Sequence, residues 1–442
     1  MTQIFRNTLP GVVGAGLTVP LVDGGHVGYA NLDHAASAPC LEAVRDAVDE
    51  LLPWYSSVHR GAGLASQVCT SAYEEAREHV RAFVGAYDRD AVVFTRNTTD
   101  ALNLLARAVP RGASVVQFES DHHAALLPWR SPLVHRIPTP TSPEQAVRAL
   151  DAALERTAAG PRLVVLTAAS NVTGELWPVD ELAAVARHHG ARVAVDAAQL
   201  APHAAVSMRE WDVDYVAISG HKLYAPFGAG ALVGRADWLE LAQPYLAGGG
   251  ATERVVDNGD HLGVSWNPAP QRHEAGTPNV IGVHALAAAC RALTRTGWAA
   301  VAAHEHRLLT RLRAGLAGLP GVRELTLFGP AASRVGIAGF AVDGHDPAVL
   351  AGALSAEHGI GVRDGAFCAH LAVPRLLGRA GSPATRALRA SVGLGTTVEH
   401  VDRLVNALGS LLSDGPRWRY REVDGRWLPD PDPRERPILL AS

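Results

Sequence analysis

The sequence predicts an α/β protein in which a large domain with a mostly parallel sheet is followed by a smaller α+β domain. Short β-branched runs alternate with amphipathic stretches up to about Gly282, and strands that alternate with helices form parallel sheets covered on both faces. Beyond Trp298 this alternation gives way to long helices and separated strands. The chain has 442 residues, 48% of them hydrophobic, which is enough for a large core and excludes a mainly disordered protein.

The expected elements follow from the hydrophobic spacing. Candidate strands of the large domain are Ala91–Thr95, Ser114–Phe118, Arg162–Thr167, Arg192–Asp196, Asp214–Ser219 and Ala229–Gly234. Apolar residues at helical spacing predict helices at Thr99–Val109, Pro143–Ala158 and Val179–His189. In the small domain we expect strands near Arg334–Val342 and Arg386–Val392, and helices near Val301–Leu319, Pro347–His358 and Thr397–Leu412.

We expect four segments along the chain. Residues 1–30 are an irregular lead-in that packs with the small domain, 31–297 form the large domain, 298–413 the small domain and 414–442 a tail. The tail is dense in Arg, Asp and Pro. It also contains Trp418 and Trp427, and because exposed tryptophans are costly, we expect it to clasp a neighbouring surface.

Charge and cysteine content limit the function classes. Forty Lys plus Arg against 44 Asp plus Glu give a net charge of −4, without the basic excess of a dedicated nucleic-acid binder. The four cysteines have neither paired nor metal-finger spacing, so a disulfide scaffold or a structural metal site is not indicated and a cytoplasmic protein is expected. The apolar stretch from Gly11 to Val22 is too short to span a bilayer.

Lys222 is the single lysine of the chain, and all other basic residues are arginine. An arginine bias should spare a lysine where a primary amine is needed, because arginine cannot form an imine. The alternative is that this lysine remains by chance. The residues around Lys222 distinguish the two explanations.

Polar residues follow the predicted strands at the edge where open α/β sheets bind ligands. Each is weak alone, since such a residue is usually a cap, but together they form a coherent set. After successive strands come Thr98 and Thr99, then Asn171, then Asp196 and Gln199, then Ser219, His221 and Lys222.

This combination of a phosphate cradle, an acid and an amine is what pyridoxal 5'-phosphate requires. Lys222 would form the internal imine, and Asp196 would keep the pyridine nitrogen protonated so that the ring can take up electrons. Gln199 or Asn171 would bond the phenolate oxygen. Ser219, His221, Thr98 and Thr99 would hold the phosphate.

The chain resembles the class V aminotransferase family of fold-type I enzymes, and within it the cysteine desulfurase and selenocysteine lyase branch. The resemblance covers roughly Asn31 to Leu412 and implies a seven-stranded, mostly parallel sheet. It is carried by N-L-D-H-A-A (from Asn31), V-H-R-G (Val58), T-R-N-T-T-D-A-L-N (Thr95), D-H-H-A-A-L-L-P-W (Asp121), S-N-V-T-G (Ser170), V-D-A-A-Q (Val195), S-G-H-K-L-Y-A-P-F-G (Ser219), E-A-G-T-P-N (Glu274), V-R-D-G-A-F-C-A-H (Val362) and R-A-S-V-G (Arg389).

The resemblance implies further roles. His122 would stack on the cofactor ring and relay protons, Thr277 would reach the cofactor phosphate of the other subunit of a homodimer, and Arg389 would grip the substrate α-carboxylate. It also makes Asn171, Arg363 and His59 candidates for substrate binding. Cys368 would be the nucleophile of an L-cysteine desulfurase, becoming a persulfide and releasing alanine, with a protein as a possible sulfur acceptor.

Two alternatives remain open from the residues. One is a PLP-dependent C–S lyase or epimerase-like enzyme in which Cys368 is a bystander. Departures from the family pattern, such as Ala125 and Gly395 in place of asparagine, fall on the substrate side, so the cofactor is assigned more safely than the substrate. The other is a catalytically idle dimeric scaffold, against which Lys222 and Asp196 argue. Cysteine, selenocysteine and a cysteine conjugate are not distinguished as substrates.

Overall fold

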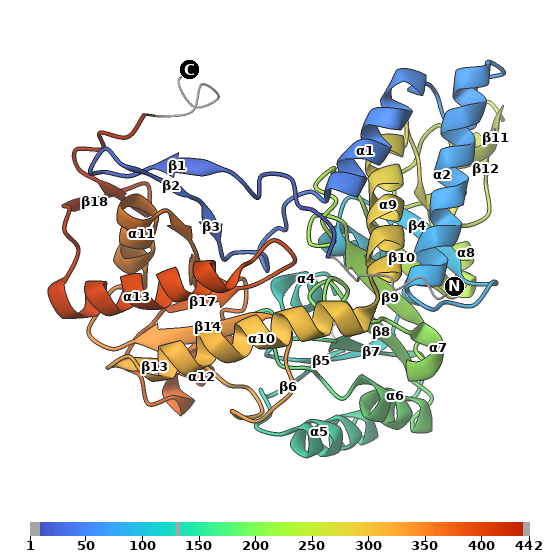
Figure 1. The fold of residues 1–442 in the computed structure, drawn as a ribbon. Helices are drawn as coiled ribbons and strands as arrows, with labels where there is room; N and C mark the ends of the chain where they lie inside the picture. Colours follow the sequence, from blue (N-terminus) through green and yellow to red (C-terminus); the bar gives the residue numbers. More distant parts are fainter. Residues whose placement is uncertain (1–8, 130–132, 436–442) are drawn as a thin grey trace, which may run out of the picture.

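The structure is a computed structural model that describes residues 9–129 and 133–435. Its centre is a seven-stranded sheet in the order β4-β10-β9-β8-β7-β5-β6, parallel from β9 to β6, with β10 antiparallel to both its neighbours (Figure 1). The strands are β4 (Ala91–Thr95), β5 (Ser114–Phe118), β6 (Val134–Ile137), β7 (Arg162–Thr167), β8 (Arg192–Asp196), β9 (Tyr215–Ser219) and β10 (Gly230–Gly234). The mostly parallel sheet is confirmed, whereas β6 was not predicted.

Both faces of this sheet are buried. Successive side chains of a strand point to opposite faces, and here they belong to two different hydrophobic clusters. On one face Val93 packs with Leu102 and Leu105 of α3 (Thr98–Ala108). On the other, Val164 shares a cluster with residues of α5 (Pro143–Glu155) and α6 (Val179–His188), which lie together below the sheet in Figure 1. All three helices match predicted ones to within a few residues at their ends.

Other elements of this part of the chain were not predicted from the sequence. Helix α9 contacts both α1 and α2, and the three stand beside β4 and β10 (Figure 1). The helices are α1 (Glu42–Leu51), α2 (Leu64–Phe83), α4 (His123–Leu126), α7 (Met208–Trp211), α8 (Ala236–Leu241) and α9 (Val280–Thr296), with short 3₁₀ turns at Leu52–Trp54 and Gln271–His273. A hairpin joins β11 (Thr252–Asp257) to β12 (Leu262–Trp266).

A second, antiparallel sheet of four strands has its own core. Its order is β13-β14-β17-β16, and the strands are β13 (Val322–Glu324), β14 (Ile337–Val342), β16 (Arg363–Gly365) and β17 (Ala387–Ser391). The helices of this region are α10 (Trp298–Ala317), α11 (Pro347–His358), α12 (Ala372–Arg379) and α13 (Val398–Asp414). Helix α11 has the predicted bounds, since Pro347 starts it and Gly359 ends it in a left-handed conformation.

The N-terminal segment is less irregular than expected. β1 (Thr18–Pro20) and β2 (His26–Gly28) form an antiparallel hairpin, and β3 (Ala30–Asn31) pairs in parallel with β15 (Ile360–Gly361). The Val22 N–H donates to the carbonyl of Ala356 on α11. The lead-in therefore rests on the region of the smaller sheet.

The tail also packs against α11, as a hairpin of β18 (Tyr420–Val423) and β19 (Arg426–Pro429). The carboxylate of Glu357, only 3% exposed, accepts hydrogen bonds from the backbone N–H groups of Arg417 (3.0 Å) and Trp418 (3.2 Å) and from the Tyr420 hydroxyl (2.8 Å). One buried carboxylate on α11 therefore anchors the tail.

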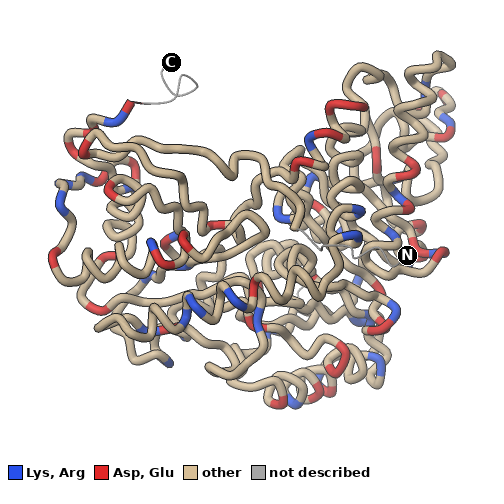
Figure 2. Tube along the Cα trace, viewed as in Figure 1, with Lys and Arg blue, Asp and Glu red and all other residues tan. Residues whose placement is uncertain are grey.

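Acidic and basic residues are interspersed over the molecule (Figure 2). No helix in the described ranges is long and apolar enough to cross a membrane.

We expect Glu357→Ala to free the tail. The substitution removes the acceptor of the partly buried donors of Arg417, Trp418 and Tyr420, and a hydrogen bond to a charged group contributes about 1.5–3 kcal/mol. Trypsin should then cleave at the tail arginines at least about tenfold faster, since a tenfold change corresponds to about 1.4 kcal/mol. Glu422→Ala, an exposed carboxylate of the same hairpin, is the matched control. Equal cleavage of both variants at the parent rate would show that Glu357 does not anchor the tail.

Candidate active site

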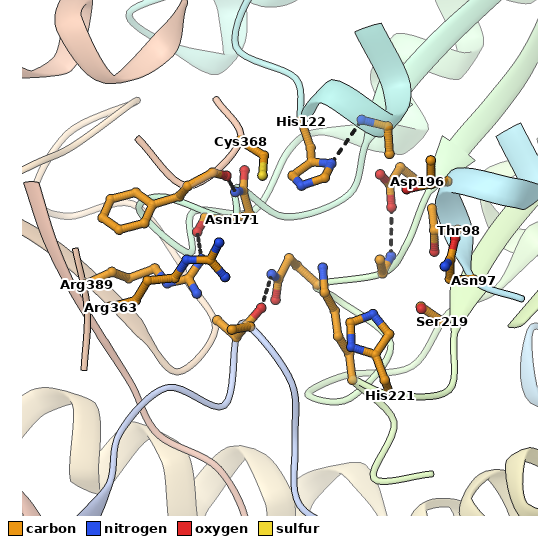
Figure 3. A pocket seen from close by; sticks show the side chains of 18 residues that line it. Asn97, Thr98, His122, Asn171, Asp196, Ser219, His221, Arg363, Cys368 and Arg389 are labelled. Carbon is orange, nitrogen blue, oxygen red and sulfur yellow. Dashed lines mark hydrogen bonds between the residues drawn. The ribbon is translucent and has the colours of Figure 1, made fainter. Parts of the chain in front are cut away.

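A cavity of about 220 Å³ lies where the carboxyl ends of the large sheet face the loop after β16 (Figure 3). It brings together most of the residues that the sequence singled out. The lining includes Thr98, Thr99, His122, Asn171, Asp196, Gln199, Ser219, His221, Lys222, Arg363, Cys368 and Arg389. Two candidates, Thr277 and His59, lie outside it.

The strand register aligns these ends. Thr167 of β7 pairs with Asp196 of β8, and Gly230 of β10 lies opposite both Thr95 of β4 and Ser219 of β9. A Cβ on Gly230 would stand 2.8 Å from the Cα of Asn97, so only glycine lets the start of α3 approach Ser219 this closely. The register thus delivers a helix start and a strand end to the same corner of the cavity.

That corner has the donors of an anion site. The hydroxyls of Thr98 and Ser219 are buried and have no hydrogen-bond partner in the described part of the chain. Thr98 and Thr99 open α3, whose Asn97 cap side chain accepts from the Asp100 N–H and leaves the first backbone N–H groups of the helix without intrahelical acceptors. Unpaired hydroxyls at a helix N-terminus are suited to a phosphate.

Lys222 and Asp196 both line the cavity, and the charge of each affects the pKa of the other. Burial lowers the pKa of Lys222 to about 8, and the Asp196 carboxylate counteracts this shift. Burial raises the pKa of Asp196, and Lys222 counteracts it. Asp196 also accepts the N–H of Ala198 at 2.9 Å. An amine with a lowered pKa is more available as a nucleophile than an exposed lysine.

Gln199 and His221 flank this pair. The Gln199 side chain donates to the carbonyl of Ala35 (2.8 Å), while its Oε1 is buried without a partner in the described ranges. Burial, followed by the neighbouring Lys222 charge, lowers the pKa of His221 to about 4. Both side chains therefore offer neutral hydrogen-bonding groups to a ligand.

His122 caps α4, and its ring lines the cavity (Figure 3). Its Nδ1 accepts the N–H of Ala124 at 3.0 Å, so the proton of the neutral ring belongs on Nε2. Burial, followed by the Lys222 charge, lowers the pKa of His122 to about 3. The ring is thus held neutral in one tautomer and one orientation.

The opposite wall comes from the smaller sheet. Arg363 and Arg389 are paired residues of β16 and β17, so their side chains leave the same face. The Arg389 guanidinium, 2% exposed, donates to the carbonyl of Asn171 (2.9 Å) and to Asp33 (3.0 Å). Burial lowers the pKa of Arg389, and Asp33 counteracts this. Two cationic side chains thus face the amine of Lys222.

Cys368 lies in the loop between β16 and α12, at the cavity rim beside His122 (Figure 3). The Asn171 amide donates to the carbonyl of Phe367 at 2.6 Å, and the His123 N–H donates to the carbonyl of Cys368 at 2.9 Å. Two contacts from the large-sheet side of the cavity therefore hold the backbone that carries the thiol.

Thr277 and His59 lie elsewhere in the chain. Thr277 lines a separate cavity with Tyr73, Phe94 and Tyr245, whereas His59 bonds Glu74 at 2.9 Å. Arg60 donates to the carbonyl of Gly276, which brings the two segments together. Within one chain neither reaches the cavity of Lys222.

The cavity also contains residues that sequence reasoning missed. Asn97 precedes a predicted helix and follows a strand, so its capping position was readable. Phe367 and Ala35 carried no comparable signal, because their place in the lining depends on contacts between distant segments.

The chain is similar to known proteins both in sequence and in structure. The family model for aminotransferase class-V matches residues 30–404. The chain is 37% identical over 392 residues to a cysteine desulfurase of Klebsiella pneumoniae, covering 86% of this chain and 92% of the relative. It is 38% identical to one of Dickeya dadantii, covering 86% and 91%.

Solved structures agree with this assignment. A cysteine desulfurase from Thermococcus onnurineus superposes with a TM-score of 0.76 at 32% identity, over 87% of this chain and 94% of the other. The cysteine desulfurase CsdA of Escherichia coli gives 0.75 at 33%, over 92% and 97%. The predicted fold type I is thereby confirmed, and the chain belongs to the class V aminotransferase family, in its cysteine desulfurase branch.

Proposed function

We propose that this protein is a pyridoxal 5'-phosphate-dependent L-cysteine desulfurase that transfers the substrate sulfur to Cys368 and releases alanine. The observation that carries the proposal is the placement of a thiol, Cys368, in the same cavity as the amine of Lys222 and the buried carboxylate of Asp196. Relatives that align with this chain over 92% and 91% of their own length bear the name cysteine desulfurase. A C–S lyase would need no thiol at this position.

The residues present fit the cofactor. Lys222 would bind it covalently, Asp196 would pair with its ring nitrogen, and Gln199 or Asn171 would bond its phenolate oxygen. The unpartnered hydroxyls of Thr98 and Ser219, with Thr99 and His221, would hold its phosphate. When bound, pyridoxal phosphate supplies an electron sink that makes the substrate carbons acidic.

The arginine wall suits the substrate carboxylate. Arg389 keeps a buried, unpaired Nε in the described structure, and its other nitrogens are fixed by Asp33 and Asn171. A guanidinium locked in this way binds a carboxylate with little loss of side-chain freedom. Arg363 on the paired strand and the side chain of Asn171 complete the proposed substrate site.

Cys368 takes the sulfur in a balanced step. Its thiolate attacks the sulfur of L-cysteine, the S–S bond of a persulfide forms and the substrate C–S bond breaks, while the substrate carbon takes up a proton. Sulfur is oxidised and carbon is reduced, so L-cysteine and the thiol yield alanine and the persulfide without a further oxidant. His122, neutral with its proton on Nε2, is placed to pass protons at the cavity rim.

The proposal includes a cytoplasmic homodimer with shared sites and the domain ranges 31–297 and 298–413. Thr277 and His59 lie together away from their own cavity, which suits residues that complete the cavity of a second copy. Thr277 would then reach the cofactor phosphate of that copy, and His59 its substrate. The persulfide would pass to an acceptor protein.

Borohydride reduction of the cofactor-loaded protein should leave one pyridoxyl-labelled peptide, the one that contains Lys222, because no other lysine exists in the chain. Peptide mass spectrometry locates the label, and Lys222→Ala is the control that should lose it. A label found only at the N-terminal amine would overturn the assignment.

Asp196→Asn should retain bound cofactor but lose turnover about 10- to 1,000-fold, the factor that corresponds to a pKa shift of about 1–3 units from one adjacent charge. A neutral amide no longer favours the protonated ring nitrogen. Steady-state alanine release measures the loss. Asp88→Asn, whose side chain is fully exposed, is the control, and equal rates for the two variants would refute the role of Asp196.

Cys368→Ser should bind cofactor and still give the spectral change that L-cysteine induces, yet form no persulfide and release little alanine. Alanine, pyruvate and sulfide are measured together after addition of L-cysteine. Cys40→Ser, a cysteine outside the cavity lining, is the control. Turnover of Cys368→Ser at the parent rate, or pyruvate as the main product of the parent, would favour the lyase alternative.

A further inference from the structure

The loop that carries Cys368 has a strained backbone. Phe367 and Cys368 have φ angles of +52° and +55°, although neither is glycine. Left-handed conformations of such residues cost of order 1–3 kcal/mol each and persist only where the surroundings impose them. Contacts around the loop must therefore hold the thiol in place.

On the Phe367 side the tie is Asn171, which donates to its carbonyl (2.6 Å). On the far side of Cys368 the ties come from one residue of α4. The backbone N–H of His123 donates to the Cys368 carbonyl (2.9 Å), and its imidazole Nε2 bonds Nδ1 of His370 at 3.1 Å, with the ring centroids 4.7 Å apart. His123 therefore clamps the loop both at Cys368 and two residues beyond it.

A bond between two imidazoles depends on their charge. It needs one protonated nitrogen and one bare nitrogen, so it exists while at least one ring is neutral. When both rings are charged, no acceptor remains and two cations face each other. Burial, followed by the charge of the nearby His370, lowers the pKa of His123, so the His123 ring is held neutral. Its Nε2, which also accepts the backbone N–H of His370 at 3.5 Å, is the bare nitrogen of the pair.

The other charged and titratable groups around the pair are few. His122 precedes His123 on the same turn with its ring centroid 6.4 Å away, and the Cys368 thiol lies in the clamped loop. From α12, Arg375 pairs with Glu119, which follows β5. In the described part of the chain no carboxylate forms an ion pair with His123 or His370.

We propose that His123 and His370 are positioning residues that hold Cys368 in its reactive geometry through their imidazole–imidazole bond. The proposal rests on the proposed function for its catalytic consequence, but the clamp itself is a property of the loop. Neither residue of this pair lines the cavity of Lys222.

The test uses the cofactor-loaded protein and compares His370→Gln, His370→Ala and His188→Ala. Glutamine can donate and accept without titrating, alanine can do neither, and His188 is an exposed histidine of α6 that also faces a second imidazole, His189, at 5.3 Å. Hydrogen–deuterium exchange of the peptide 364–372 is measured at about pH 8, above the ordinary histidine pKa.

We expect His370→Ala to lose protection about fivefold relative to the parent, the factor that corresponds to about 1 kcal/mol for one hydrogen bond. His370→Gln and His188→Ala should keep the protection of the parent. Alanine release at about pH 8 should fall about fivefold in kcat for His370→Ala with KM unchanged, and His370→Gln should restore it.

The two proposals fail separately. A parent protein that forms no persulfide refutes the desulfurase, whereas the exchange pattern still reports on the clamp. If His370→Ala is protected like the parent, or if His370→Gln is as unprotected as His370→Ala, the clamp is refuted.

Discussion

The site depends on one buried charge. A guanidinium taken out of water is costly unless it is paired, and Arg389 meets that requirement through Asp33 and the carbonyl of Asn171. These partners come from the N-terminal segment and from the loop after β7, whereas Arg389 belongs to β17 of the smaller sheet. Satisfying one charge therefore joins three separate segments and closes the cavity between the two sheets.

The same contacts divide the labour of the cavity. The large sheet supplies Lys222, Asp196 and the unpartnered hydroxyls from strand ends whose positions follow from β-sheet register. The smaller sheet supplies the arginines and the thiol. Asn171 links the halves, since its carbonyl holds Arg389 and its amide holds the Cys368 loop. A movement of either sheet relative to the other would therefore shift the backbone that carries the Cys368 thiol.

The sequence predicts the large-sheet half of the site well, because Asp196, Ser219 and Lys222 follow β-branched runs directly and Lys222 is unique. It predicts less where tertiary contact decides. β6 is a short edge strand with polar His135 and Arg136, and α9 is apolar on nearly every side, so neither shows a clear period. Nothing local foretells the left-handed Phe367 and Cys368, or the bond between His123 and His370.

Cys368 is proposed to receive the sulfur of L-cysteine, and the rest of the site positions it for that step. The most direct measurement adds L-cysteine with isotopically labelled sulfur to the cofactor-loaded protein, traps thiols by rapid alkylation and examines each cysteine peptide by mass spectrometry. We expect one labelled sulfur on Cys368 and none on Cys40, Cys69 or Cys290. The amount of alanine released should equal the amount of labelled sulfur on Cys368. Label released as free sulfide with Cys368 unmodified would contradict it.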